Sequence, residues 1–485
     1  MTQAANHPVN HSDQHSEKLS VWTKLAYGSG DLGTAITAAL RSFFLLFFLT
    51  DVARLSPITA GSILLINRVW DAFNDPLIGW LSDRTVTRWG RRRPWLIAGA
   101  LPFGILFFMT WVVPPFGPRG LYIYYVVVAL LLDTVYTIIN VPYVALTPEL
   151  TQDYDERTSL NSYRFAFSIG GGLVAAVLHP IIVNHFADVR TGYMVSGAVW
   201  SIVSTIPCFI VFFGTKERPE SMQKTQDADS MGILEQIKVA FSNKPYRFVI
   251  AIYLFSWLAL QLISAVLIYY LNYYIGAPDM LPMVLLAIQG TALVFLFIWS
   301  AVSRRLDKRY VYMIGASIWI VVQIALYFVQ PGMRGVIIPL AAVAGAGASV
   351  AYLIPWAMMP DVIEFDELET GQRREGIFYG FMVFLQKTSI ALGIFMVGRV
   401  LSSNGYITPT EAVPVPVQPD SALNAIRLFI GPIPAVILLI GLILTYFYPV
   451  TREKHGQIRA RLAERREALD AAAAQKQDNI PATDD

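Results

Sequence analysis

Long apolar runs limit the folds open to this chain more than any other feature. Twelve such runs, each about 20–27 residues long, recur along the 485 residues. A helix needs about 20 apolar residues to cross a bilayer, and inside the hydrocarbon a spanning segment must satisfy its own backbone hydrogen bonds. The pattern therefore predicts an all-α membrane protein. The predicted spans are 28–50, 59–81, 95–114, 121–146, 158–183, 192–214, 246–271, 279–302, 310–330, 335–359, 376–402 and 424–449.

Composition and cysteine usage agree with this class. Only 15% of the residues are charged and 55% are hydrophobic, whereas soluble domains have about 25% charged residues. The single cysteine, Cys208, excludes a disulfide framework and a cysteine metal site. The first 19 residues are polar and lack the apolar core of a signal peptide, so we expect the first run to remain as a span.

The runs divide into two sets of six around a polar stretch. The sequence Val-Pro-Tyr at 141–143 in the fourth run matches Ile-Pro-Trp at 354–356 in the tenth, which indicates an internal repeat. We therefore predict twelve transmembrane helices in two six-helix bundles related by a pseudo-two-fold axis. The expected domains are a disordered tail (1–20), an N-terminal bundle (21–214), a linker (215–245), a C-terminal bundle (246–450) and a C-terminal tail (451–485).

Basic residues predict the orientation of the chain in the membrane. Loops of one parity are rich in Lys and Arg, and loops of the other parity have single basic residues. By the positive-inside rule, both termini and the linker are expected in the cytoplasm of a plasma (inner) membrane protein. The two richest loops contain Arg84, Arg88, Arg91, Arg92 and Arg93, and Arg304, Arg305, Lys308 and Arg309.

Two carboxylates in the second run point to a cation site. Asp71 and Asp75 are four residues apart and so share one face of a helix, with Asn74 beside them. Because charges inside a bilayer are unfavourable by roughly 2.5–3.5 kcal/mol each, they indicate function or pairing. Thr137 and Lys387 lie at a similar depth, ~14–17 Å from the cytoplasmic ends of their runs. We expect Asp71, Asn74, Asp75 and Thr137 to bind a cation, with Lys387 as the counter-charge. The alternatives are a permanent salt bridge and a structural polar cluster.

Other polar and aromatic residues in the runs predict a substrate cavity. Its candidates are Arg41, Tyr136, Asn140, Arg164 and Trp356, because aromatic faces and bidentate donors suit a polar, ring-shaped ligand. Arg41 would also attract an anionic group. The alternatives are that Arg41 pairs with an aspartate and that Tyr136 and Trp356 only pack.

The loop after the second run contains more ordered charged residues than membrane orientation alone requires. It combines Asp83, Arg84, Arg91 and Arg92 between Gly79 and Pro94. A carboxylate there can bond a helix end while the arginines clamp acidic partners. We predict a cytoplasmic gate.

At this point a family resemblance is clear. The loop 79–94 resembles the signature loop of the major facilitator superfamily, and four segments resemble its glycoside–pentoside–hexuronide:cation symporters, which include the melibiose permease. These are Tyr-Gly-Ser-Gly-Asp (27–31), Trp-Asp-Ala-Phe-Asn-Asp-Pro (70–76), Asp-Glu-Arg-Thr (155–158) and Gly-Gln-Arg-Arg-Glu-Gly (371–376).

The resemblance implies roles for individual residues. The family's cation site matches Asp71, Asn74, Asp75 and Thr137, its span-eleven Lys matches Lys387, and its span-five Arg near the sugar matches Arg164. The galactoside site does not match, because Ala35, Asn140 and Val144 stand where the melibiose permease has Asp, Asp and Trp.

The expected function is cation-coupled symport of a glycoside or related sugar by alternating access, with sodium or a proton as the coupling ion. We expect no other metal or cofactor, no enzyme activity, no nucleic-acid partner and a monomer in the lipid bilayer. The first alternative is a lysolipid or amphiphile symporter of the same fold. The second is a non-transporting receptor or a membrane-embedded enzyme, and the absence of a GxxxxGK[ST] run argues against a nucleotide-driven pump.

Overall fold

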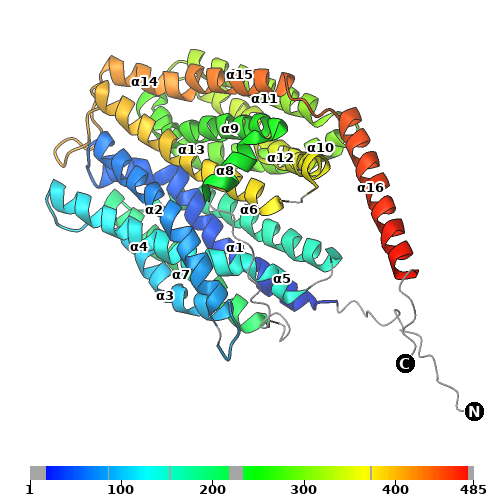
Figure 1. Ribbon diagram of the computed structural model, residues 1–485. Helices are drawn as coiled ribbons and strands as arrows, with labels where there is room; N and C mark the ends of the chain where they lie inside the picture. The colour runs from blue at the N-terminus through cyan, green and yellow to red at the C-terminus, as the bar shows by residue number, and fades with distance from the viewer. Residues whose placement is uncertain (1–17, 86, 152–153, 218–232, 372–373, 479–485) are drawn as a thin grey trace, which may run out of the picture.

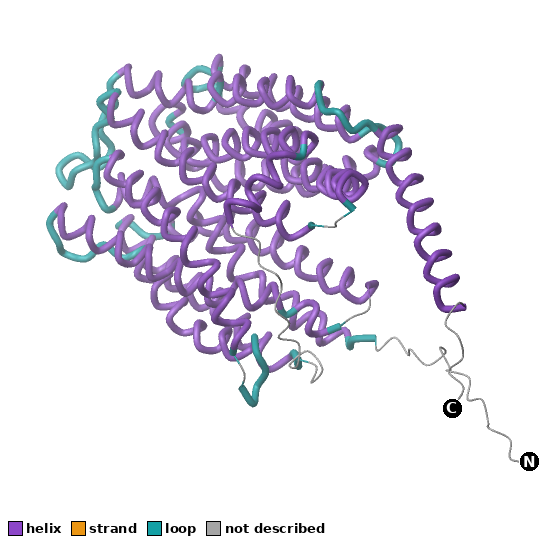
Figure 2. The backbone as a smooth tube through the Cα atoms, in the orientation of Figure 1, coloured by secondary structure: helices purple, strands orange, loops and turns teal. Residues whose placement is uncertain are grey.

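The computed structural model describes residues 18–85, 87–151, 154–217, 233–371 and 374–478, and these residues are almost entirely helical (Figures 1 and 2). Within them the only extended pairing is an isolated bridge between Thr87 and Gly90. The prediction of an all-α protein is confirmed for this part of the chain. We refer to residues 18–217 as the first half and 233–478 as the second half.

The helices of the first half follow the predicted runs closely. The first run forms α1, which continues through the π-helical turns η1 and η2. The bounds are α1 Val21–Leu40, η1 Arg41–Leu45, η2 Phe48–Val52, α2 Pro57–Arg84, α3 Arg93–Thr110, α4 Pro118–Ala145, the short α5 Thr147–Leu150, α6 Tyr154–Asn184 and α7 Val189–Gly214.

The second half differs from the prediction at its end. The last run is broken into α14 and α15, because Gly431 leaves the helical conformation and Pro432 cannot donate a backbone hydrogen bond. The bounds are α8 Ile233–Ser242, α9 Lys244–Tyr269, η4 Tyr270–Ile275, η5 Pro278–Met280, α10 Leu281–Ser303, α11 Lys308–Phe328, α12 Arg334–Thr370, α13 Glu375–Ser403, α14 Asp420–Ile430, α15 Pro432–Tyr446 and α16 Arg452–Asp478.

Each half packs mainly within itself (Figure 1). In the first half α1 lies against α6 and α7, while α3 contacts α4 and α7. In the second half α12 contacts α10 and α11, while α9 contacts α13 and α15. The halves meet chiefly where α2 packs on α13 and α6 packs on α10.

Glycines allow the closest helix contacts. A Cβ at Gly28 of α1 would lie 2.9 Å from the backbone of Tyr163 in α6. A Cβ at Gly398 of α13 would lie 3.3 Å from the carbonyl carbon of Pro57 in α2, and nearer still to its oxygen. Small residues at such crossings let membrane helices approach until their backbones touch.

Ten helices of the described residues are long and apolar enough to cross a membrane. The apolar stretch described in α2, Pro57–Asn67, is shorter than a membrane-spanning helix. The loops 85–92 and 304–307 mark what we call the basic end of the molecule. The loops 53–56 and 404–419 mark the opposite end, which we call the far end.

Candidate functional site

The candidate cation site begins on α2. This helix starts at Pro57, and the side chain of Ser56 accepts the backbone N–H of Thr59 as its N-cap. About four to five turns further on, Asp71 and Asn74 are buried, with 5% and 3% of their surfaces exposed. Asp75 is only partly buried, on the same helix.

Lys387 of α13 lies against both carboxylates. Its Nζ forms an ion pair with Asp75 and lies 3.7 Å from Oδ2 of Asp71. The hydroxyl of Thr137 on α4 donates to Oδ1 of Asp75 at 2.8 Å. Four of the five residues predicted for this site therefore meet, and they join α2 and α4 of the first half to α13 of the second.

Asn74 is directed differently. Its Nδ2 donates to the backbone oxygen of Asp133 at 3.3 Å. It therefore ties α2 to α4 beside the carboxylate pair.

Asp133 is a buried carboxylate that the sequence interpretation did not single out. It is 2% exposed, forms an ion pair with Arg41 and accepts a hydrogen bond from Nδ2 of Asn67. The signal was present, because Asp133 lies within the fourth apolar run, one turn before Thr137. The charge of Arg41 is thus compensated inside the first half, as the alternative interpretation of Arg41 had it.

Arg164 forms a second ion pair within the first half. Its Nε lies 3.2 Å from Oδ2 of Asp31 on α1, and its guanidinium lies 5.8 Å from the ring centre of Tyr143. Asp31 was also missed as a site residue, although it ends the segment 27–31 on which the family resemblance partly rests.

The remaining substrate candidates lie in different surroundings. Trp356 of α12 is 39% exposed, donates to the hydroxyl of Tyr253 at 3.2 Å and stacks on Tyr379 with ring centres 5.7 Å apart. Tyr136 of α4 lies near the ring of Phe103, and Asn140 is half-buried one turn along α4. The described contacts thus place Trp356 among aromatic residues of its own half.

The predicted gate loop is organised around an acidic residue that sequence reasoning missed. The carboxylate of Glu217 accepts the backbone N–H groups of Arg91, Arg92 and Arg93 at 2.6–2.9 Å, and so caps the start of α3. Gly90 has a φ of +111° and a Cβ there would collide with this carboxylate, so the loop needs glycine at this position.

Arg92 of the predicted gate clamps an acidic partner. Its Nε lies 2.9 Å from Glu149 after α4, and burial raises the pKa of Glu149, with Arg92 opposing that shift. Arg84 instead lies over the ring of Trp80, 4.1 Å from its centre. The side chain of Asp83 lies outside the described residues.

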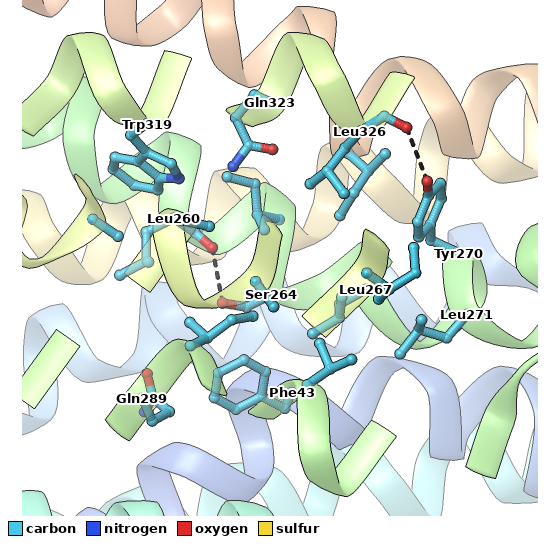
Figure 3. A pocket seen from close by; sticks show the side chains of 18 residues that line it. Phe43, Leu260, Ser264, Leu267, Tyr270, Leu271, Gln289, Trp319, Gln323 and Leu326 are labelled. Atoms are coloured by element: carbon cyan, nitrogen blue, oxygen red, sulfur yellow. Dashed lines mark hydrogen bonds between the residues drawn. The ribbon is translucent and has the colours of Figure 1, made fainter. Parts of the chain in front are cut away.

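A separate small cavity of about 50 Å³ lies in the second half (Figure 3). Its lining is mostly aliphatic, with Ser264, Gln289 and Gln323 among its few polar side chains. Phe43 of η1 is the first-half residue among the described residues that line it.

The donor set suits a coupling cation held by oxygen atoms. Carboxylate oxygens of Asp71 and Asp75 and the hydroxyl of Thr137 are ligands of the kind that hard cations take. Within the described ranges, no three His, Cys, Asp or Glu side chains gather as a metal site.

Comparison with solved structures gives the class of protein. The fold matches the crystal structure of the nucleoside transporter NupG with a TM-score of 0.61 at 14% identity, over 88% of this chain and 99% of that one. It matches an inward-facing bacterial homologue of the human lysosomal transporter Spinster with a TM-score of 0.64 at 11% identity, over 88% and 95% of the two chains. Together with the ten apolar helices, these matches show the fold of an integral, multi-pass membrane protein.

The particular family follows from the sequence. Residues 26–452 match the model of the family described as MFS/sugar transport protein, and the chain belongs to this family. It is 42% identical to an uncharacterized symporter of Synechocystis, over 93% of this chain and 98% of that one. It is 30% identical to the inner membrane symporter YicJ of Escherichia coli, over 93% and 96%.

A third relative is the sodium-dependent lysophosphatidylcholine symporter 1 of Mus musculus, which is 28% identical over 98% of this chain and 95% of that one. These comparisons confirm the family resemblance. The protein is a symporter, that is, a secondary active transporter and not an enzyme.

Proposed function

We propose that this protein couples the entry of sodium or a proton to the uptake of a glycoside or related sugar. The observation that supports this most is the bond between Lys387 of the second half and Asp75 of the first, beside Asp71 and Thr137. A bound cation supplies the positive charge that Lys387 otherwise provides. Its arrival at Asp75 therefore weakens a contact between α2 and α13, and binding becomes linked to movement of the halves.

The proposal includes the topology. Twelve spans form two six-helix bundles, 21–214 and 246–450, joined by a cytoplasmic linker at 215–245, with tails at 1–20 and 451–485. The basic end faces the cytoplasm, as the positive-inside rule requires, so both termini lie there and the far end is extracellular. The name of the Escherichia coli relative supports an inner-membrane location. We further propose that the protein acts as a monomer.

The substrate cavity is proposed to lie between Arg41, Tyr136, Asn140, Arg164 and Trp356. Because Arg41 pairs with Asp133 and Arg164 with Asp31, both guanidinium charges are balanced by carboxylates. Balanced charges favour an electroneutral solute with hydroxyl groups, such as a sugar, over an anion. On the cytoplasmic side, Arg92 with Glu149 and Glu217 forms the proposed gate, in which Asp83, Arg84 and Arg91 also take part.

A lysolipid is the second candidate substrate. Two observations favour it: relatives named as lysophosphatidylcholine symporters match nearly the whole chain, and the second half contains the aliphatic cavity of Figure 3. An apolar lining suits an acyl chain better than a sugar.

Solute counterflow in proteoliposomes distinguishes the two. The panel contains α- and β-glycosides, pentosides, hexuronides and a lysophosphatidylcholine, each with and without sodium at two pH values. The proposal predicts exchange of at least one neutral glycoside, enhanced by sodium or by acid. Exchange of the lysolipid alone would contradict the glycoside assignment and establish the second candidate.

A further inference from the structure

A buried carboxylate joins the two halves at the far end. Asp51, at the end of the first span, accepts hydrogen bonds from the hydroxyls of Thr50, Tyr273 and Tyr406, the last at 2.8 Å. The hydroxyl of Thr50 also lies 2.6 Å from that of Tyr269. We call these five residues the Asp51 cluster.

The members of the Asp51 cluster come from four places in the fold. Asp51 and Thr50 belong to η2 of the first half. Tyr269 ends α9, Tyr273 lies in η4, and Tyr406 follows α13, all in the second half. Tyr269 and Tyr406 are buried, and their rings pack edge to face with centres 5.6 Å apart. The hydrogen bonds that Tyr269, Tyr273 and Tyr406 make in this cluster therefore exist only while the two halves are together at this end.

The charge of Asp51 is held by hydroxyl groups. Within the described ranges, no Lys or Arg forms an ion pair with it. A carboxylate in such a place depends on its hydrogen-bond donors, because a buried charge without them is strongly unfavourable. The second half supplies two of the three donors. If the second half moves away, water must reach Asp51 and replace these two hydrogen bonds.

A cavity at the far end provides that access. Its volume is about 460 Å³, and its lining includes Asp51 and Tyr273 together with Arg54, Arg190 and Asn272. Arg54 also forms an ion pair between the halves with Glu411 of the loop 404–419, at 2.9 Å. We call this cavity the vestibule. The Asp51 cluster lies between the vestibule and the interior of the protein.

We propose that Asp51 is a positioning residue of the transport cycle, which holds the far end closed through Tyr273 and Tyr406 and releases both when the vestibule opens inward. This inference rests on the proposed function, because alternating access requires the far end to open once in each cycle. A carboxylate suits the task, since it accepts the tyrosine hydroxyls in the closed state and water in the open one.

We call the hydrogen bonds from Tyr273 and Tyr406 to Asp51 the latch. Thiol labelling tests the latch without any substrate. Ser264 and Phe43 of the first half both line the cavity of Figure 3, so we expect separation of the halves at the far end to expose Ser264. The reporter is Ser264→Cys in a Cys208→Ala background, labelled from outside by a membrane-impermeant maleimide. The test variants are Tyr273→Phe and Tyr406→Phe, which lose only a hydroxyl. Tyr274→Phe is the matched control, because its hydroxyl donates to Val329 inside the second half at 3.1 Å.

The expected result is a labelling rate raised roughly tenfold in Tyr273→Phe and Tyr406→Phe, the equivalent of about 1.4 kcal/mol in the opening equilibrium. Tyr274→Phe is expected to label like the parent. Equal rates in all four proteins would overturn the latch. Counterflow by the parent reports separately on the proposed function: a parent that exchanges no solute, with labelling that still follows the two hydroxyls, would refute the symport proposal and leave the latch standing.

Discussion

Three carboxylates of the first half each have a basic partner from another helix. Asp133 is paired with Arg41, Asp31 with Arg164, and Asp75 with Lys387. The first two pairs lie within one half, whereas the third crosses between the halves. We therefore expect the first two pairs to stabilise the first half. The third pair is expected to break or form when the two halves move relative to each other.

The pair of Asp133 and Arg41 is therefore a test of stability. Asp133→Asn leaves a buried guanidinium without its carboxylate, and breaking a buried pair in this way is unfavourable by about 3–5 kcal/mol. We expect a clearly lower melting temperature in detergent, and recovery of most of the loss in the double variant Arg41→Gln/Asp133→Asn.

The exposed carboxylate Glu411 gives the matched control for this measurement. It also pairs with an arginine, but 78% of its side chain is exposed, so Glu411→Gln should change the melting temperature little. An Asp133→Asn protein as stable as the parent would mean that the pair contributes nothing to folding.

The sequence predicted individual residues of the site better than their pairings. Asp71, Asp75, Thr137 and Lys387 could be brought together because helix period and depth in the bilayer place them at one level. The partners Asp31 and Asp133 were not found, because pairing across helices depends on rotation about each helix axis. An apolar run does not specify that rotation.

At the scale of elements, the start of α3 depends on a residue 124 positions away, since Glu217 accepts the N–H of Arg93 at the helix start. Glu217→Gln replaces one accepting oxygen by an NH₂ group and removes a charge that favours a helix N-terminus. We expect a loss of about 1–2 kcal/mol, measured as a melting temperature lower by a few degrees. Glu464→Gln, on the exposed surface of α16 and away from both of its ends, is the control, and equal shifts in both would exclude a capping role.

The contact between α2 and α13 depends on Gly398. Replacing glycine by alanine inside a helix normally stabilises the helix by up to about 1 kcal/mol. At position 398, however, a Cβ would collide with the backbone of Pro57. We expect Gly398→Ala to lower both the melting temperature and the transport rate.

Gly290 of α10 is the matched control for this substitution, because a Cβ there would meet nothing within 4 Å. Gly290→Ala should be neutral or stabilising. A Gly398→Ala protein that behaves in the same way would show that the helices do not approach as closely as described.

Element positions were the most predictable part of the fold. Runs of apolar residues marked almost every helix, because crossing a bilayer imposes both length and composition. The break between α14 and α15 was missed, since Gly431 and Pro432 lie inside a run that is apolar throughout. The π-helical turns of the first span also have no signal in hydropathy.

At the scale of the whole molecule, two sets of contacts join the halves at different depths. Lys387 with Asp75 lies within the membrane-spanning region, and the Asp51 cluster lies at the far end. A cation that displaces Lys387 loosens the first set, and opening of the vestibule requires loss of the second. Coupling follows if the two sets break in the same step of the cycle.

The measurement that tests this account most directly is uptake driven by a cation gradient in proteoliposomes, with the solute that counterflow identifies. The proteins compared are the parent, Asp71→Asn, Asp75→Asn and the surface control Glu453→Gln. The account predicts that both aspartate variants lose accumulation against a gradient while retaining part of the exchange activity, and that the control accumulates like the parent. Accumulation at the parental level in both aspartate variants would contradict it, because the coupling ion would then bind elsewhere.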